Sequence, residues 1–372
     1  MSRIATIEAI PYCIDYAKTL RFASGHVDKA DHILLRIRTE DGVEGIADAP
    51  PRPYTYGETQ RSIRAIIDEV LAPQLIGARA DDTARTNEVL KRTVNNNVAK
   101  AAIDIALWDI KAKTYGTTLT RMLGGFTDRV QVAHMVGFAE TRDVLAEVDS
   151  LIERYGITAF KVKVGRPDVQ QDIDVCRALR EKFGDDITMY ADGNRGWNAR
   201  ESAFVMDALS ELGLAFVEEL NPASEAFGRR GIVRAACMPF VVDESAPTPS
   251  DVWRSLQDGD GTAVSIKTAR TGFTDSLRIW GLCSSAGVDT VMGNQIDTQV
   301  GSLATVAFGA AFRETSAMAA EVSNFLDMED DLQAEPLQIR DGCALVPDRP
   351  GYGAEIDEDK LAFYRTDSVS YT

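Results

Sequence analysis

Charged residues recur at nearly even intervals through this chain, each at the end of a short apolar run. The series starts with two lysines in Phe160-Lys161-Val162-Lys163-Val164 and continues with Asp192, Glu218, Asp243, Lys267 and Glu321. Counted from Lys163, the steps are 29, 26, 25, 24 and 54 residues, and the last is twice 27. One strand, one helix and their loops need about that length, since a βαβ unit takes roughly 30 residues. The series therefore predicts side chains at the same end of successive parallel strands, where β/α barrels carry their active sites.

Strand-like and helix-like segments alternate from about residue 128 onward. The strand-like runs are rich in β-branched residues and cover 130–136, 159–164, 187–191, 215–217, 240–242, 263–266, 290–292 and, more weakly, 319–322. This alternation predicts parallel strands joined by helices, hence the α/β class. Eight strands favour a closed barrel, and no GxGxxG motif follows a strand to support a dinucleotide-binding fold.

The first 125 residues have a different pattern. An alternating strand at 32–38, an Asp41-Gly42 turn and a return strand at 43–47 precede helical patterns at 58–75, 81–93 and 98–113. After about residue 325 the chain becomes polar and rich in turns, and we expect it to run back to the N-terminal module. The predicted organisation is an α+β module at 1–125, a barrel at 126–325 and a returning C-terminal segment at 326–372.

Bulk composition excludes some classes of partner. The net charge is −17 and the pI is about 4.7, which argues against binding to nucleic acid or to an anionic membrane. A local metal ion or lysine pair can still attract a small anionic substrate. The N-terminus lacks the apolar core of a signal peptide and no run of 18 apolar residues occurs, so we expect a cytoplasmic protein.

The two lysines are expected to act together. Side chains at positions i and i+2 of a strand share a face, about 6.5–7 Å apart. At an effective dielectric constant of about 20, two ammonium groups at that distance repel by ~2.5 kcal/mol. Before counter-charges are considered, this repulsion would depress the pKa of one lysine by up to ~2 units. A lysine brought toward neutrality is a competent general acid or base.

Three of the acids follow three consecutive strands. Each of Asp192, Glu218 and Asp243 could singly be a helix cap or loop residue, but their regular spacing favours one shared site. Three hard oxygen ligands suit Mg²⁺, and no neighbouring His or Cys favours zinc. Lys267 comes one strand later, across the barrel from the lysine pair. A metal flanked by lysines suits enolate chemistry, in which a lysine moves the proton α to a metal-bound carboxylate.

A lysine base with Mg²⁺ is the established arrangement of the enolase superfamily. The chain resembles the muconate-lactonizing branch of that superfamily over essentially its whole length. The resemblance is carried by Lys161-Val162-Lys163, Asp192-Gly193-Asn194-Arg195-Gly196-Trp197, Val217-Glu218-Glu219, Val242-Asp243-Glu244-Ser245, Ile266-Lys267 and Leu123-Gly124-Gly125. It implies a (β/α)7β modified TIM barrel, covered by an N-terminal α+β capping domain that the C-terminal segment closes.

The resemblance also implies roles for the charged residues. Mg²⁺, with Mn²⁺ as a substitute, would bind Asp192, Glu218 and Asp243. Lys163 would be the acid/base lysine, Lys161 its electrostatic partner and Lys267 the group that stabilises the enolate, while Glu321 would hydrogen-bond to the substrate or a metal-bound water. Many relatives have proline two residues after the metal-binding glutamate, whereas this chain reads Glu218-Glu219-Leu220-Asn221-Pro222, so Glu219 stays open as the ligand.

Segments of the cap resemble the loops that choose the substrate in muconate cycloisomerases. These are Arg21-Phe22-Ala23-Ser24-Gly25 and 49–59, and Gly293-Asn294-Gln295-Ile296-Asp297 of the barrel also matches that branch. The implied reaction converts cis,cis-muconate to muconolactone. The expected contacts to this small carboxylate substrate are Arg52, Tyr54, His26, Asn294 and Asp297. His134, on the first barrel strand, is expected to be a hydrogen-bonded core histidine.

The same residues allow other interpretations. A racemase or epimerase of N-acylamino acids or dipeptides, and a dehydratase like succinylbenzoate synthase, would use the same machinery. A Schiff-base lysine aldolase and a non-catalytic metal-stabilised barrel belong to different classes, and the three ordered carboxylates disfavour the aldolase. The sequence leaves open the syn or anti course of lactonization. The resemblance suggests a homo-oligomer, with an octamer among the candidate assemblies.

Overall fold

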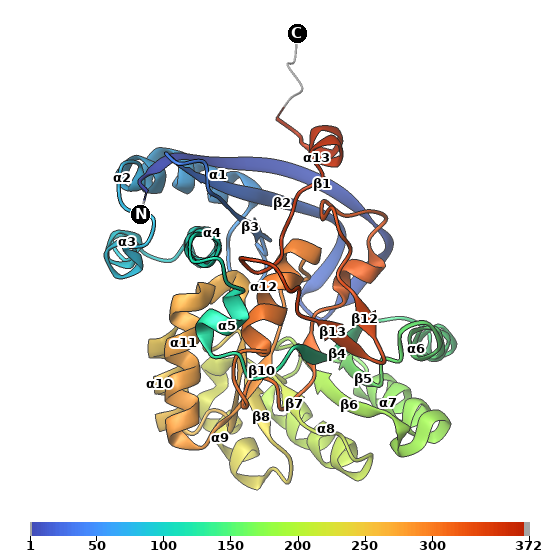
Figure 1. The fold of residues 1–372 in the computed structure, drawn as a ribbon. Helices are drawn as coiled ribbons and strands as arrows, with labels where there is room; N and C mark the ends of the chain where they lie inside the picture. Colours follow the sequence, from blue (N-terminus) through green and yellow to red (C-terminus); the bar gives the residue numbers. More distant parts are fainter. Residues whose placement is uncertain (1, 368–372) are drawn as a thin grey trace.

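A long antiparallel hairpin crosses the top of the molecule. In this computed structural model, which describes residues 2–367, β1 (Ile4–Phe22) pairs with β2 (Gly25–Thr39), and β2 pairs with β3 (Glu44–Ala49). The tip of the hairpin reaches over the barrel (Figure 1). Met1 and residues 368–372, the end of the predicted C-terminal segment, lie outside the described residues.

Helices complete this N-terminal module. They are α1 (Gln60–Ile66), the π-helical turn Ile67–Leu71, α2 (Ala72–Leu75), α3 (Thr83–Leu90), α4 (Asn97–Thr114) and α5 (Leu119–Leu123). The alanines of α4 let it pack closely on β3. A Cβ added at Gly45 would lie 2.0 Å from the carbonyl oxygen of Ala106, so only glycine permits this approach.

Eight parallel strands form the barrel. They are β4 (Arg129–Val136), β5 (Ala159–Lys163), β6 (Thr188–Asp192), β7 (Val217–Glu218), β8 (Phe240–Val242), β9 (Ala263–Ile266), β10 (Asp289–Met292) and β11 (Ala320–Glu321). Neighbouring strands pair in chain order from β4 to β10, and β11 returns to pair with β4, which brings the sheet round into a barrel.

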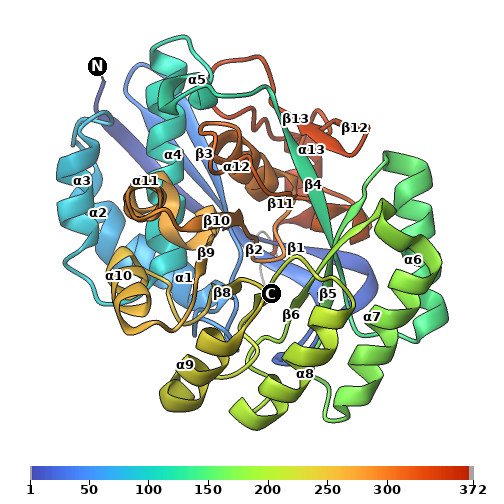
Figure 2. The same cartoon turned by 90° about the horizontal axis from the view of Figure 1, so that it is seen from below.

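Seven helices connect these strands and form the outer ring seen in Figure 2. They are α6 (Thr141–Tyr155), α7 (Val169–Phe183), α8 (Ala199–Glu211), α9 (Ala226–Ala235), α10 (Pro249–Asp258), α11 (Thr268–Ala286) and α12 (Gln299–Gly309). Strand and helix order together confirm the predicted (β/α)7β barrel beneath an α+β cap.

The barrel interior is layered. The lower layer is an apolar cluster of Ala133, Ala159, Tyr190, Phe216, Val241, Ala263 and Val291. Because alternate residues of a strand face the same way, the next inward residue of each strand lies one layer higher. On β5, β6 and β7, and directly after β8, that residue is Lys161, Asp192, Glu218 or Asp243. An apolar plug therefore supports a charged layer at the carboxyl ends of the strands.

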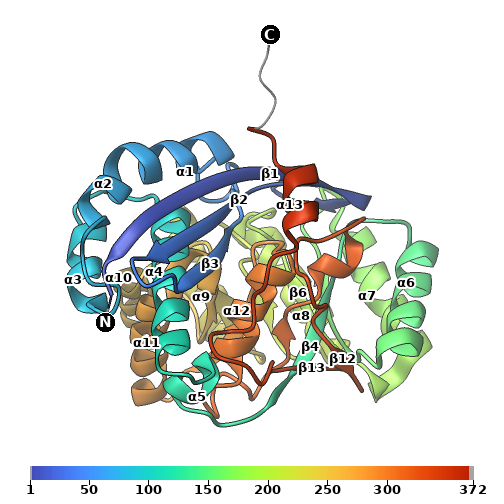
Figure 3. The ribbon, with the colours of Figure 1, turned by 45° about the horizontal axis from the view of Figure 1, so that its top comes forward.

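The C-terminal segment connects barrel and cap. After the short 3-10 helix Asn324–Asp327, the hairpin of β12 (Ile339–Arg340) and β13 (Cys343–Leu345) pairs antiparallel with β4. The Tyr352 hydroxyl then donates to the Ile46 carbonyl of the cap sheet over 2.8 Å. The final helix α13 (Glu358–Tyr364) lies beside β1 (Figure 3). Among the described residues, no helix is both long enough and apolar enough to span a bilayer.

Candidate active site

The two lysines of β5 point into the barrel at different depths. The Lys161 ammonium is fully buried and contacts carboxylate oxygens of Asp192 (3.0 Å), Glu218 (2.9 Å) and Glu321 (2.9 Å). The Lys163 ammonium, one layer higher, contacts Asp192 (2.6 Å) and lies within 4.0 Å of no other carboxylate among the described residues. It also donates to the side-chain oxygen of Asn194 over 2.8 Å.

These counter-charges overturn the expected mutual depression of the lysine pair at Lys161. Burial disfavours its charge, but Asp192, Glu218 and Glu321 outweigh burial and raise the pKa of Lys161 well above its ordinary value. The repulsion predicted from the sequence considered only the two ammonium groups. Carboxylates from β6, β7 and β11 supply the opposing charge, and Lys161 is held as a permanent cation.

The opposite side of the site carries its own cations. The Lys267 ammonium contacts one oxygen of Asp243, and the Arg270 guanidinium contacts the other at 2.6 Å. Burial would raise the pKa of Asp243, but these two cations hold it well below the ordinary range. Glu321 is held by hydrogen bonds to both of its oxygens. One oxygen accepts from the Tyr190 hydroxyl (3.0 Å), and the other accepts from the backbone N–H and the side-chain amide of Asn294.

Glu218 and Glu219 have opposite surroundings. Glu219 is fully committed, because one oxygen pairs with buried Arg229 at 2.9 Å and the other accepts from the backbone amides of Asp243 (2.8 Å) and Ser245 (3.1 Å). Glu218 contacts Lys161 through one oxygen, while its buried Oε2 has no hydrogen-bond partner in the described part of the chain. The unsatisfied oxygen favours Glu218 over Glu219 as a metal ligand.

Asp192, Glu218 and Asp243 are candidates for holding a divalent cation. Burial and the charges of Asp192 and Asp243, among others, raise the pKa of Glu218, as expected for a carboxylate crowded by carboxylates. The three donors are all hard oxygens, and the orphaned Glu218 Oε2 lies among them, so the residues fit Mg²⁺. Within residues 2–367 their oxygens do not all come within 4.8 Å of one another; Lys161 contacts Asp192 and Glu218, and Lys267 contacts Asp243.

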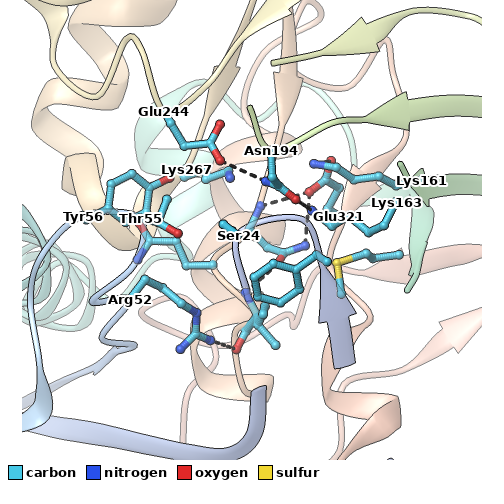
Figure 4. Close-up of a pocket in the computed structure, with 15 residues that line it drawn as sticks. Ser24, Arg52, Thr55, Tyr56, Lys161, Lys163, Asn194, Glu244, Lys267 and Glu321 are labelled. Carbon is cyan, nitrogen blue, oxygen red and sulfur yellow. Dashed lines mark hydrogen bonds and ion pairs between the residues drawn. The ribbon is translucent and has the colours of Figure 1, made fainter. Parts of the chain in front are cut away.

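A small cavity opens above this charged layer. Its floor includes Lys161, Lys163, Lys267 and Glu321, and Figure 4 shows Lys267 and the β5 lysines reaching in from different sides. The walls and roof come from Phe22, Ser24, Arg52, Thr55, Tyr56, Met135, Asn194, Glu244, Asn294, Gln295 and Ile296. Charged groups thus lie at the floor and, through Arg52 and Glu244, in the walls, with apolar side chains among them, as expected of an enclosure for a small carboxylate.

The predicted substrate contacts divide into two groups. Arg52 and Asn294 line the cavity. His26 and Tyr54 are exposed and instead line a larger outer groove between the hairpin tip and the 51–61 loop. Asp297 is buried outside the cavity lining, where burial and the nearby charge of Asp48 raise its pKa to about 7. The structure thus places these three side chains outside the cavity lining, on an outer groove or in the protein interior, and their contact with the substrate stays a prediction.

Several lining residues were not predicted as site residues. Asn194 and Glu244 stood within the quoted motifs, and their direct contact (2.9 Å) joins the ends of β6 and β8. Tyr56 stood within the 49–59 segment, two residues from Tyr54, and is the tyrosine that points inward. The motif spacing was the available signal for Asn194 and Glu244. Nothing in the loop sequence distinguishes Tyr56 from Tyr54.

Comparison with known proteins identifies the family. Residues 9–124 match the mandelate racemase/muconate lactonizing enzyme N-terminal domain, and residues 143–360 match the enolase C-terminal domain-like family. The chain belongs to the enolase superfamily, in its muconate-lactonizing branch, and is an isomerase. Members of this superfamily bind a divalent metal ion.

Solved and curated relatives cover nearly the full length. The muconate lactonizing enzyme from Mycobacterium smegmatis, complexed with muconolactone, is 53% identical with a TM-score of 0.97, and the match covers 98% of this chain and 100% of that one. Muconate cycloisomerase 1 of Pseudomonas putida is 28% identical, with 89% of each chain covered. L-Ala-D/L-Glu epimerase of Bacillus subtilis is 26% identical, with 94% of this chain and 96% of the relative covered.

Proposed function

We propose that this protein is a Mg²⁺-dependent enzyme that converts cis,cis-muconate to muconolactone. The observation that carries the proposal is the 53% identity, over 98% of the chain, to a lactonizing enzyme whose structure contains muconolactone. The epimerase relatives match over similar lengths at only 22–26% identity. A cavity with cations at its floor and a buried guanidinium in its wall supports a substrate with a carboxylate at each end.

Arg52 is proposed to hold the distal carboxylate. Its guanidinium is buried and donates to the backbone carbonyls of Pro51 (2.6 Å) and Ile296 (2.9 Å). No carboxylate of the described residues lies within salt-bridge distance of it. A buried cation with only neutral partners favours an anionic ligand, because the ligand restores the charge balance that burial removes.

The reaction needs one bond closure and one proton. An oxygen of the distal carboxylate bonds to the carbon β to the proximal carboxylate, and the π-electron pair of that double bond moves toward the proximal carboxylate to give an enediolate. Lys163 then delivers a proton to the α-carbon, which completes the lactone. A divalent cation on Asp192, Glu218 and Asp243 would supply positive charge for the proximal carboxylate as its negative charge grows.

The surroundings of the lysines support this division of roles. Lys161 contacts three carboxylates and is held as a cation, so it is proposed to stabilise charge rather than to move a proton. Lys163 contacts one carboxylate and lines the cavity. Lys267 faces it from the other side and is proposed to stabilise the enediolate, with Glu321 hydrogen-bonded beside the substrate.

The decisive experiment follows the loss of the muconate diene absorbance with purified protein. Activity should disappear after dialysis against EDTA and return with Mg²⁺, with Mn²⁺ as a weaker or equal substitute. In D2O, the lactone should carry one deuterium at the carbon α to its free carboxylate. Failure to consume muconate in the presence of Mg²⁺ would overturn the proposal.

An epimerase is the second candidate, because lysines on opposite faces of one cavity can remove and return a proton at a single α-carbon. Incubating N-acylamino acids and dipeptides in D2O tests this directly. Deuterium exchange at the α-carbon, faster than muconate turnover, would reassign the substrate and retain the machinery. Borohydride trapping of a lysine adduct together with indifference to EDTA would instead indicate an aldolase.

We also propose that the protein forms a homo-oligomer, as the resemblance suggested. Large apolar side chains are exposed on the isolated chain, among them Phe227 (98%), Phe363 (79%) and Phe204 (58%). Exposed aromatic side chains of this size are typical of association surfaces. Light scattering coupled to size-exclusion chromatography measures the assembly mass, and a monomer would contradict this part of the proposal.

A further inference from the structure

A second group of potential metal ligands lies outside the barrel, away from the charged layer. His134 extends from the outer face of β4, Glu147 from α6 and Asp327 from the 3-10 helix after β11. One ligand atom from each lies within 4.8 Å of those from the other two. His134 is fully buried, while the Glu147 and Asp327 side chains are 20% and 10% exposed.

Hydrogen bonding fixes the orientation of His134. The Ser323 hydroxyl donates its single hydrogen to the carbonyl of Ala133 over 3.1 Å, so it must accept at 3.0 Å from Nδ1–H of His134. This confirms the expected hydrogen-bonded core histidine. In the neutral ring, Nε2 is then a bare lone pair. Metal-binding histidines have this arrangement, in which the second nitrogen donates to a fixed acceptor.

The Nε2 atom is aimed at two carboxylates without hydrogen-bonding to either. It lies 3.3 Å from Glu147 Oε1 and 3.6 Å from Asp327 Oδ2, and among residues 2–367 neither His134 Nε2 nor Asp327 Oδ2 has a hydrogen-bond partner. These separations are long for hydrogen bonds. Ligand bonds of about 2.0–2.2 Å at tetrahedral angles place neighbouring zinc ligands about 3.4 Å apart, between the two observed values.

A cation already approaches this group from the cap. The Lys18 ammonium contacts Glu147 (2.5 Å) and Asp327 Oδ1 (3.1 Å), and its side chain is 40% exposed. Lys18 lies where the β1–β2 pairing is irregular, between Asp15 and Leu20. The Lys18 side chain can swing out into solvent, whereas the Glu147 and Asp327 carboxylates and the His134 imidazole remain oriented toward one shared position.

We propose that His134, Glu147 and Asp327 form a second metal site, selective for a divalent ion of the zinc class, which Lys18 covers in the metal-free state. The imidazole nitrogen favours Zn²⁺, Co²⁺ or Ni²⁺ over Mg²⁺, which takes oxygen ligands. Two carboxylates and a neutral imidazole carry a charge of −2, which a divalent ion neutralises and one ammonium only halves. Water fills the remaining coordination position.

Zinc titration of the full-length protein in excess Mg²⁺ tests the proposal, because Mg²⁺ saturates the oxygen-only site in the barrel. Calorimetry should show that the wild type binds one further equivalent of Zn²⁺. Bound Co²⁺ should give visible absorption bands, and X-ray absorption should show a nitrogen ligand. His134→Gln and, as a partly exposed helix variant that should fold normally, Glu147→Gln should both lose this equivalent.

Lys18 provides the matched comparison. Lys18→Met should tighten zinc binding about fivefold, because removing a competing, partly exposed ion pair is worth up to about 1 kcal/mol. Lys29→Met, which removes an exposed ammonium paired with Asp15 on the same hairpin, should leave the affinity unchanged. Absence of the further equivalent in wild-type protein, or its undiminished presence in both His134→Gln and Glu147→Gln, would overturn the proposal.

Discussion

Adjacent glutamates should give opposite phenotypes when each is changed to glutamine. Glu219 pairs with Arg229, whose guanidinium is fully buried beside the ring of Phe240. Glu218 lies among carboxylates and leaves one buried oxygen unsatisfied. Because strand β7 ends between them, the two side chains face different environments: one holds the loops after β7 and β8 together, and the other faces the charged layer.

The magnitudes follow from which charges remain. In Glu219→Gln, Arg229 keeps the carbonyls of Asn221 and Asp260 but loses its only carboxylate within the described residues. Breaking a buried ion pair on one side costs about 3–5 kcal/mol. We expect a loss of about 3 kcal/mol in unfolding free energy, which would lower the midpoint of thermal unfolding by about 5 °C.

Glu218→Gln should leave stability nearly unchanged. Lys161 retains Asp192 and Glu321 as partners, and the repulsion that raises the pKa of Glu218 disappears. We expect a change in unfolding free energy of no more than about 1 kcal/mol. Mg²⁺ affinity should fall about a hundredfold, since even the outer partners of metal ligands are worth about 10- to 100-fold.

Urea unfolding and Mg²⁺ calorimetry on both variants distinguish the roles. The reasoning predicts an unstable Glu219→Gln that binds Mg²⁺ within a few-fold of wild type, and a stable Glu218→Gln that does not. The reverse pattern, with stable Glu219→Gln protein that has lost Mg²⁺ and intact binding in Glu218→Gln, would refute it. Circular dichroism of each variant at 20 °C verifies that the comparison concerns folded protein.

Three further changes test the site. Lys163→Met should lower kcat about a thousandfold in the muconate assay, whereas Lys182→Met on exposed α7 should not, since acid/base groups contribute about 10²–10⁴. Arg52→Met should raise KM for muconate at least about tenfold, because one charge-assisted hydrogen bond is worth about 1.5–3 kcal/mol; an unchanged KM would exclude the proposed contact. For Asp297, burial raises the pKa from 3.8 to about 7, so between these pH values the folded state holds a proton that the unfolded chain releases. The unfolding free energy therefore falls as pH rises from about 4 to 7. Asp297→Asn should flatten this fall, and a pH profile identical to that of the wild type would contradict the assignment.

The barrel and its charged layer could be predicted because both depend on local periodicity. Residues 159–164 were expected to be a strand, and β5 covers Ala159–Lys163. The weakest predicted strand, at 319–322, is observed as two residues, Ala320–Glu321, and still positions Glu321 beside Lys161. Each unit of a parallel strand and a helix has nearly the same length and register. Residues that are evenly spaced in the sequence therefore lie at the same end of the barrel.

The cap contributions could not be predicted in the same way. Tyr54 is 76% exposed while Tyr56 lines the cavity, and their loop has no repeating pattern that separates inward from outward positions. Asp297 was predicted to contact the substrate because its motif resembles that of the family. In the structure the backbone turns at Ile296, which has a left-handed φ of 60°, and Ile296 lines the cavity while Asp297 lies in the interior. Loop paths depend on tertiary contacts that no local pattern records.

The depth of each lysine follows from strand register. Lys161 pairs in register with Met135 and Tyr190 on the neighbouring strands, and Lys163 pairs in register with Asp192. A step of two residues, about 6.6 Å along the strand, therefore separates a lysine enclosed by three carboxylates from one that contacts a single carboxylate at the cavity. A group that must release a proton during the reaction cannot be the one whose charge its neighbours fix. The register of β5, more than the chemistry of lysine itself, thus supports the proposed roles, charge stabilisation for Lys161 and proton transfer for Lys163.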